Sequence, residues 1–415
     1  MIRVGVISQH FFKENSKILR VFNIAEHIQV IEFENGCRSI CLNREKCLNT
    51  IDLQMAKAII KILNSYKDDP NCKMILITSK VKNFFSVGGD LKVNYGKSFE
   101  ELCRIGFRFF TKMALLEYII HYYPKPIVSL VNGTVLGAGI SLSFHTKYTV
   151  VSENLKFSMP ENYVGIVPDN GSSYLIGKLK SVGLYMLLTS ARINHLDAID
   201  LNLASNFCPE KNIKNLEMEL QSSFEIGSQK GLESILHKHC MPKRFVNLNA
   251  GITVKNRNII EKCFNWGFKT FDEIHKQLKL EAENENLDED ARKFIFNSLV
   301  AIDLLVPVSV RTCFELVHRN EGRSLKECLL NEIRCDVHIA RRNDLQEGIK
   351  RVLLDKTYQP KFDPSTIDQV PSELVEYMFE PLTNSDTANY GDDEYMKVLL
   401  ESFGEIDNFD FLSPL

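Results

Sequence analysis

The order of the first apolar segments restricts the fold of this chain more than any other feature of its sequence. Alternating or apolar runs typical of β-strands lie at residues 26–33, 38–42, 73–79 and 127–133. A helix-periodic stretch, residues 49–66, separates the second run from the third. Strand, strand, helix, strand predicts an α/β fold.

The predicted helix should bury one face and begin at a polar cap. Asn49 or Thr50 is a natural N-cap. The apolar positions that share one face at helical spacing are Met55, Ile59, Ile62, Leu63 and Tyr66.

After about residue 210 the strand signals fade and the pattern becomes helical. We therefore expect a core over residues 23–210 and a helical C-terminal region over 211–382. The best-marked helix starts at Ser324, where Ser324 and Glu327 form a capping box. The apolar positions that follow it are Leu325, Leu329, Ile333 and Val337. Residues 383–415 are acidic, with interspersed aromatic residues, and are expected to be a flexible tail.

Composition excludes several classes of protein. The chain has 415 residues, 44% hydrophobic and 25% charged, with a net charge of -3, which is ordinary for a globular protein and disfavours a nucleic-acid surface. No apolar run approaches the ~18 residues of a membrane-spanning helix. The 11 cysteines include no C-x-x-C pair, so a reducing compartment is expected. His237, His239 and Cys240 match no standard metal-ligand spacing, and no metal is predicted.

The first 22 residues are basic, apolar and nearly free of acids. This composition predicts a mitochondrial presequence over residues 1–22. A basic N-terminus without a targeting role is the alternative.

Two glycine-rich turns follow predicted strands. Gly88 and Gly89, in the segment "FFSVGGDL", free the backbone for unusual dihedral angles and leave N–H groups uncovered by side chains. Further on, "LGAG" places the amide of Ala138 near the N-terminus of a helix, where negative charge is favoured. Each turn alone has a purely structural interpretation, because tight turns and packing glycines give the same pattern.

Two acids come soon after these turns, each directly behind a proline. They are Glu161 and Asp169, eight residues apart in apolar surroundings. Backbone donors together with paired carboxylates suit acyl chemistry, because donors stabilise a developing oxyanion and a carboxylate serves as base, acid or nucleophile. Gly165 and Gly171 should provide the bends that bring the two acids together. Solvated loop acids are the alternative.

Five segments together resemble the crotonase, or enoyl-CoA hydratase/isomerase, superfamily, and within it the 3-hydroxyisobutyryl-CoA hydrolases. The resemblance runs from about Ile24 to Leu382. The segments are "LNREKCLNTI", "FFSVGGDL", "KPIVSLVNGTVLGAGISLS", "FSMPENYVGIVPDNGSSYL" and "DLQEGIKRVLLDKTYQPKF".

This resemblance implies a spiral of ββα turns followed by a helical C-terminal region, with a coenzyme A thioester bound between them. By position, the amides of Gly89 and Ala138 would form the oxyanion hole, with Glu161 as the main catalytic carboxylate and Asp169 as its partner. The residues that would contact the substrate more loosely are Gly88, Asp90, Met113 and, along the coenzyme A path, Lys46 and Leu48.

The sequence also departs from the family pattern. Ala138 stands where the family usually has glycine, and Ser141 where enoyl-CoA hydratases keep a second glutamate. Met113 stands where hydrolases of this type commonly carry a glutamate, which predicts a more apolar acyl pocket. Asn170 replaces a small apolar residue, in a turn where asparagine is common.

The expected activity is hydrolysis of a short 3-hydroxyacyl-CoA, such as 3-hydroxyisobutyryl-CoA in valine breakdown, in the mitochondrial matrix. No cofactor beyond the substrate's coenzyme A and no nucleic-acid or membrane partner is expected; a homo-oligomer is compatible with the sequence. Two alternatives stay open: an enoyl-CoA hydratase or isomerase, and a non-catalytic paralogue that is a component of the small subunit of mitochondrial ribosomes.

Overall fold

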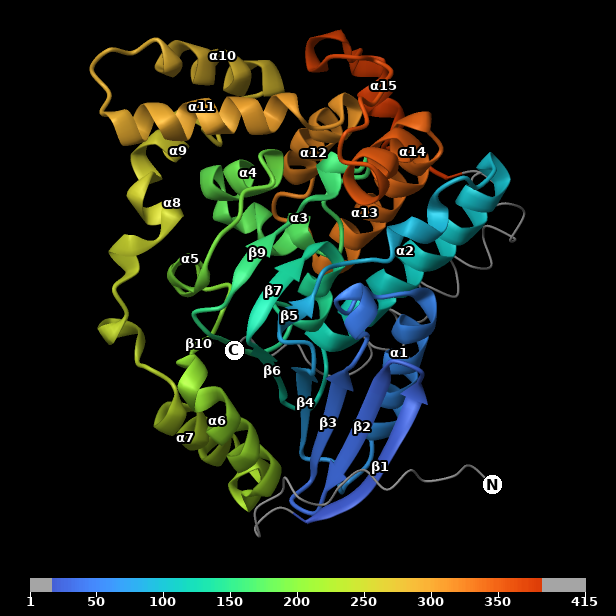
Figure 1. Cartoon of the computed structure of the whole chain (residues 1–415), viewed down its shortest axis with the longest axis vertical. Coiled ribbons are helices and arrows are strands. Elements are labelled where there is room, and N and C mark those ends of the chain that lie inside the picture. Colours follow the sequence, from blue (N-terminus) through green and yellow to red (C-terminus); the bar gives the residue numbers. More distant parts are fainter. Residues whose placement is uncertain (1–16, 383–415) are drawn as a thin grey trace.

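Two β-sheets form the centre of the computed structural model, which describes residues 17–382 (Figure 1). The larger sheet has the strand order β1-β2-β3-β4-β6-β8-β10 and the smaller one β5-β7-β9. The large sheet contains β1 (Ile18–Ala25), β2 (Ile28–Phe33), β3 (Cys37–Leu42), β4 (Met74–Ser79), β6 (Ile127–Val131), β8 (Tyr148–Val151) and β10 (Asn206–Phe207). The small sheet contains β5 (Asn83–Ser86), β7 (Gly133–Leu136) and β9 (Lys156–Ser158).

Strand pairing makes the chain wind as a spiral. β1, β2 and β3 pair antiparallel, whereas β3-β4-β6-β8-β10 and β5-β7-β9 are parallel throughout. Each of β4, β6 and β8 leads directly into one strand of the small sheet, so successive turns of the chain stack on one another. Mixed α/β architecture with this spiral core confirms the predicted fold class, and the four predicted strands correspond to β2, β3, β4 and β6.

Helices cover both faces of the large sheet. Because successive side chains of a strand point to opposite faces, Ile75 and Ile77 of β4 join the core that contains α1 (Leu53–Lys67) and α2 (Phe99–His121). Met74 and Leu76 join a second core against α6 (Glu210–Ser222) and α7 (Gln229–His239).

The predicted helix after β3 forms, but its cap differs. All five of its predicted core residues are buried. The N-cap is Asp52, whose Oδ1 accepts from the Met55 N–H at 2.8 Å. Asn49 is not the cap, because its side-chain amide is used elsewhere: Nδ2 donates to Ser79 Oγ at 2.8 Å and to the Phe85 carbonyl at 3.0 Å. Thr50 is not the cap either.

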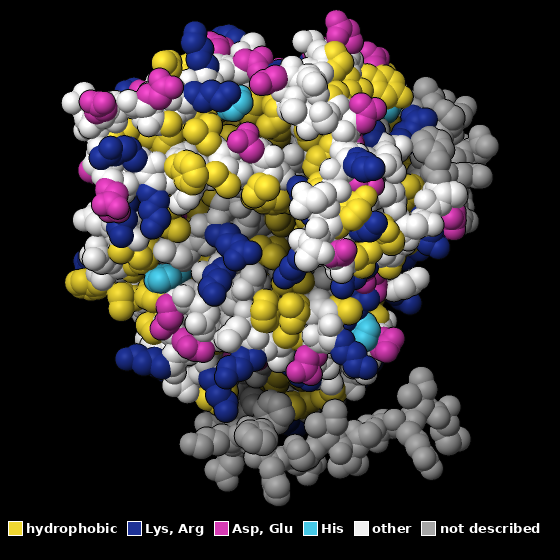
Figure 2. Space-filling model, turned by 45° about the horizontal axis from the view of Figure 1, so that its top comes forward, with side chains coloured by type: hydrophobic (Ala, Val, Ile, Leu, Met, Phe, Trp, Pro, Cys, Tyr) yellow, Lys and Arg dark blue, Asp and Glu magenta, His cyan; other side chains and the backbone are white. Residues whose placement is uncertain are grey.

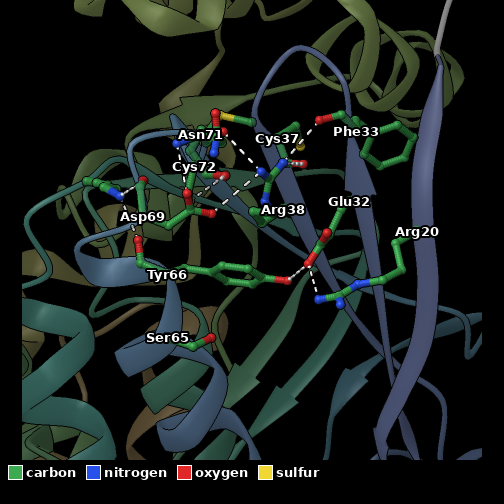
Figure 3. Close-up of polar contacts among 12 residues, drawn as sticks. Arg20, Glu32, Phe33, Cys37, Arg38, Ser65, Tyr66, Asp69, Asn71 and Cys72 are labelled. Carbon is green, nitrogen blue, oxygen red and sulfur yellow. Dashed lines mark hydrogen bonds and ion pairs between the residues drawn. The ribbon is translucent and has the colours of Figure 1, made fainter.

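Polar side chains attach α1 to the outer strands of the sheet (Figure 3). Tyr66 of α1 donates its hydroxyl to Glu32 Oε1 at 2.7 Å, and Arg20 of β1 donates to the same oxygen at 2.8 Å. Behind them Arg38 is buried, and its guanidinium donates to the backbone carbonyls of Phe33, Cys37 and Asn71. These bonds connect the first three strands of the sheet to α1 and to the segment that follows α1.

From α6 onward the described residues form helices and loops, with no further strand. Ser324 caps α13 (Leu325–Ala340) through the predicted capping box with Glu327. In Figure 1 α13 lies beside α2. The remaining helices are α3 (Ser172–Leu175), α4 (Ser181–Leu188), α5 (His195–Asp200), α8 (Ile252–Lys255), α9 (Arg257–Cys263), α10 (Phe271–Ala282), α11 (Glu289–Asp303), α12 (Pro307–Arg319), α14 (Asn343–Ile349) and α15 (Ser372–Tyr377).

Two predicted terminal segments fall wholly or partly outside the described residues. The acidic tail, 383–415, lies outside them, as do residues 1–16. β1 begins at Ile18, so the end of the predicted leader, 1–22, belongs to a sheet strand. Among residues 17–382 no single helix is long and apolar enough to cross a membrane; α11 and α12 meet that length only together and are bent by 111°.

Candidate active site

Glu161 and Asp169 are both buried in the loop that follows β9. Each side chain is 6% exposed, so the interpretation as solvated loop acids is wrong. Gly165 and Gly171 between and after them have φ values of +94° and +66°, which glycine adopts without steric cost. The two carboxyls are close enough that the charge of Asp169 contributes to the raised pKa of Glu161.

The turn that carries Glu161 is fixed by its neighbour. Glu161 opens a short 3₁₀ helix, Glu161–Tyr163, directly after Pro160. Asn162 donates from Nδ2 to the Leu187 carbonyl at 2.9 Å, and its own carbonyl accepts from the Val306 N–H at 2.9 Å. Buried hydrogen bonds to α4 and to the start of α12 therefore hold the catalytic candidate in place.

The Glu161 carboxyl lies against the two glycine turns. A Cβ added to Gly137 would lie 2.2 Å from Glu161 Oε1 and 3.8 Å from the Cα of Gly88. A Cβ added to Gly88 would lie 3.6 Å from the Ala138 nitrogen. Absence of side chains at both glycines thus lets the carboxyl and the two turns approach one another.

The N–H groups of Gly89 and Ala138 are free donors at this point. Ala138 is in the first turn of the 3₁₀ helix Gly137–Leu142, where an N–H has no partner within the helix. At Gly89 the bridge to Ile51 uses the Gly88 carbonyl and the Asp90 N–H instead. Among the described residues neither N–H donates to another group, so both can serve an oxyanion.

Burial changes the acidity of both acids. It raises the pKa of Glu161 well above 4.5, with the nearby Asp169 as the next cause. It also raises the pKa of Asp169 to about 7, although the hydrogen bond from Asn170 opposes this change. A carboxyl with a pKa of about 7, as at Asp169, exchanges protons near neutral pH, as general acid–base chemistry requires.

Three further buried carboxyls, which no sequence motif had indicated, surround this pair. Glu117 is on α2, and Glu332 and Asp336 are on α13. Glu332 accepts from the N–H groups of Gly171 and Ser173 at 2.7 and 3.0 Å. The sequence did contain a signal for Glu332 and Asp336: these two acids stand four residues apart, within the apolar stripe of the predicted helix that starts at Ser324.

Asp336 completes the attachment to α13 of the loop that carries Glu161 and Asp169. Its Oδ1 accepts from the Val167 N–H at 3.2 Å, whereas Oδ2 has no partner among the described residues. Burial raises the pKa of Asp336 well above 3.8, with Asp169 as the second cause. Burial also raises the pKa of Glu332 to about 8.

Met113 lines a small cavity between α2 and α13, together with Asp169 and Glu117. The cavity measures about 10 Å³ to the centre of a water-sized sphere, roughly the space of one water molecule. Glu117 stands one helical turn after Met113, so the same wall carries a carboxyl. The lining of this cavity is therefore apolar at Met113 but carries carboxyl groups at Glu117 and Asp169.

The remaining predicted residues lie around the turn at Gly89. Arg44 Nη1 is 2.8 Å from Asp90 Oδ2, so Asp90 is held in an ion pair. Lys46 and Leu48, in the same segment as Arg44, are exposed, and the Leu48 carbonyl accepts from the Val87 N–H at 3.3 Å. This contact joins the predicted coenzyme A segment to the glycine turn; the binding roles of all three residues stay predictions.

Comparison with known proteins decides the family. The profile described as enoyl-CoA hydratase/isomerase matches residues 37–379, most of the chain. The chain belongs to the enoyl-CoA hydratase/isomerase family. The resemblance drawn from the sequence motifs is thereby confirmed.

Within this family, curated relatives of the chain are named as hydrolases. "Probable 3-hydroxyisobutyryl-CoA hydrolase 2" of Arabidopsis thaliana is 28% identical over 364 residues, covering 86% of this chain and 93% of the relative. "3-hydroxyisobutyryl-CoA hydrolase, mitochondrial" of Homo sapiens is 28% identical over 381 residues, covering 90% and 95%.

A solved structure of the same fold is a carnitinyl-CoA dehydratase from Mycobacterium thermoresistibile. Its TM-score is 0.75 at 24% identity, and the match covers 88% of this chain and all of that one. Similarity at this level of identity establishes the fold of the family member and no more.

Proposed function

We propose that the chain hydrolyses the thioester of a short 3-hydroxyacyl-CoA, with 3-hydroxyisobutyryl-CoA of valine catabolism as the first candidate. One observation carries the proposal: a buried carboxyl, Glu161, lies against two turns whose free N–H groups suit an oxyanion. The names of the curated relatives support the same reaction.

The thioester carbonyl oxygen would accept hydrogen bonds from the Gly89 and Ala138 amides. Donors placed for the oxyanion are typically worth about 10² to 10³ in rate each. Glu161 then either takes a proton from the attacking water or attacks the carbonyl carbon itself. In both routes the C–S bond breaks, coenzyme A leaves as its thiol, and water supplies the new oxygen of the acid.

Asp169 would accept a hydrogen bond from the hydroxyl of the acyl group. A site built to pair a substrate hydroxyl rejects the analogue that lacks it. The coenzyme A phosphates would lie at the surface, where Lys and Arg side chains gather beside a hollow (Figure 2). Mitochondrial location is proposed with the function, since the human relative carries that word in its name.

The test is release of free thiol by purified protein from a panel of short acyl-CoAs that includes 3-hydroxyisobutyryl-CoA and isobutyryl-CoA. We expect the hydroxylated substrate to be hydrolysed fastest. Faster hydration of crotonyl-CoA than thiol release would establish the hydratase alternative. Absence of both reactions, with co-sedimentation on mitochondrial ribosomal subunits, would establish the non-catalytic alternative; neither alternative is favoured by the names of the curated relatives.

Oxygen-18 water separates the two roles of Glu161. If Glu161 attacks the carbonyl, and water then attacks the glutamyl carbon of the resulting anhydride, repeated turnover in labelled water transfers the label into the Glu161 side chain. If Glu161 activates water, the label appears only in the product acid. Mass spectrometry of the peptide containing Glu161 reads the difference.

A further inference from the structure

Four buried side chains form a series of hydrogen bonds that ends at Asp169. Ser141 Oγ lies 3.1 Å from Glu117 Oε1 and 3.3 Å from Asn170 Oδ1. Asn170 Nδ2 then donates to Asp169 Oδ1. Glu117 comes from α2, Ser141 from the helix Gly137–Leu142, and the other two from the loop between β9 and α3, so the series joins three separate parts of the site.

The hydrogen bonds in this series depend on whether Glu117 carries a proton. A serine hydroxyl carries one proton, yet Ser141 faces two acceptor oxygens if Glu117 is ionised. The conflict disappears if Glu117 is a neutral acid, because its own O–H then donates to Ser141 Oγ. The Ser141 proton becomes free for Asn170 Oδ1, so each of the three bonds in the series then has one donor.

The surroundings of Glu117 favour the neutral acid. Its side chain is 0% exposed, and Oε2 has no hydrogen-bond partner within the described part of the chain. Burial raises the pKa of Glu117 well above 4.5, and the carboxyls of Glu332 and Asp169 raise it further. An ionised group in this setting would be strongly disfavoured.

His145 does not supply a positive charge that would stabilise an ionised Glu117. Its Nε2 lies 3.4 Å from Glu117 Oε1, close enough for an ion pair if the ring were protonated. However, burial, followed by the nearby His121, lowers the pKa of His145 to about 3, so the ring is neutral. Its Nε2–H instead donates to the Asn170 carbonyl at 3.0 Å, which fixes the same loop from a second direction.

We propose that Glu117 is a positioning residue: as a neutral acid it donates to Ser141, which donates to Asn170, whose amide holds Asp169. The proposal rests on the proposed function, in which the ionised Asp169 receives the acyl hydroxyl. Ser141 and Asn170, two departures from the family pattern, then serve one purpose together with Glu117.

The series matters because Asp169 is surrounded by acids. Glu161, Glu332 and Asp336 all face it, and all three, like Asp169, are buried. The Asn170 amide opposes the effect of burial on the pKa of Asp169. Because Ser141 holds the side-chain oxygen Oδ1 of Asn170, the NH₂ group of the same amide stays turned toward Asp169.

The test compares variants along the series. Glu117→Leu removes the first donor and Ser141→Ala removes the connection to Asn170. Both should weaken the Asn170 bond and raise the pKa of Asp169. The acid limb of the pH profile of kcat/KM for thiol release should move to higher pH by about 0.5 to 1 unit, the scale of one neutral hydrogen bond.

Two variants serve as controls. Glu117→Gln supplies an N–H donor to Ser141 and should restore what Glu117→Leu loses. Ser298→Ala also removes a buried serine hydroxyl, which donates to the Phe294 carbonyl at 2.9 Å in α11, and should leave the pH profile unmoved. Thermal unfolding of all variants separates a loss of stability from a shift in the profile.

An infrared measurement tests the neutral acid without substrate. The difference spectrum of wild type minus Glu117→Gln at neutral pH should contain the C=O stretching band of a protonated carboxylic acid. Absence of that band would overturn the proposal, as would a 100-fold loss of activity in a folded Glu117→Gln protein or unmoved profiles in Glu117→Leu and Ser141→Ala. If the wild type releases no thiol, the proposed function fails, while the infrared band and a ¹³C NMR titration of Asp169 in Ser141→Ala still decide the series.

Discussion

Substitution of Gly137 by alanine tests whether the placement of the Glu161 carboxyl is catalytic. The added Cβ would lie 2.2 Å from Glu161 Oε1, whereas ordinary van der Waals contact begins at about 3.4 Å. The carboxyl oxygen must therefore move by about 1.2 Å. A misplacement of about 1 Å can cost on the order of 10² in rate, so kcat for thiol release should fall about 100-fold.

Backbone strain must be separated from this displacement. Gly137 has φ +45°, a left-handed value that costs roughly 1–2 kcal/mol for alanine. Gly322, between α12 and α13, is a matched control: its φ is +73°, and an added Cβ would meet nothing within 4 Å. Gly322→Ala should lose similar stability and keep full activity.

The assay is free-thiol release under saturating substrate, with chemical denaturation of both variants. A folded Gly137→Ala protein that keeps activity within about threefold of wild type would refute the reasoning, because a rate change of that size is too small for a misplaced reacting group. Equal losses in both glycine variants would assign the effect to strain instead.

Three further predictions concern separate parts of the chain. Glu161→Gln should lower thiol release by at least about 10², the scale of a lost general base, and Asp169→Asn should cost less or change the acyl preference; equal losses would contradict the assigned roles. Because the folded-state pKa of Asp336 is raised, the stability associated with its protonated form is present below about pH 4 and lost as the pH rises through the folded value. Above pH 4, Asp336 should lower the unfolding free energy of the wild type by up to about 1.4 kcal/mol for each pH unit, and Asp336→Asn should lack this contribution. Urea denaturation at several pH values measures it, and the same pH dependence in both proteins would count against a buried neutral acid. Residues 1–22 fused to a fluorescent reporter should direct it to mitochondria, and a cytosolic reporter would remove that part of the proposal.

Elements set by local pattern could be predicted from the sequence, whereas long-range contacts could not. The buried face of α1 and the capping box at Ser324 follow from residues a few positions apart, and both were correct. The predicted N-cap of α1 was wrong because the Asn49 side chain bonds to residues 30 and 36 positions away, in β4 and β5. Local sequence does not contain that competition.

The candidate site shows the same division. Glu161 and Asp169 stand beside prolines and glycines that mark their loop, so the sequence pointed to them. Glu117 has no such signal, because it comes from a helix that packs on the site. Family positions directed attention to Met113 and Ser141 and to the glutamates absent there, while the structure has a carboxyl one turn beyond Met113, in hydrogen-bond contact with Ser141.

The helical C-terminal region supplies contacts that hold the candidate site. Glu332 and Asp336 of α13 accept hydrogen bonds from backbone N–H groups on both sides of Asp169, at Gly171 and Val167. The loop that carries Asp169 is therefore held by residues more than 150 positions later in the chain. A spiral core ending near residue 210 would contain Glu161, Asp169 and both free amides, yet it would lack the contacts that fix their geometry. The geometry of the candidate site therefore depends on the core and α13 together.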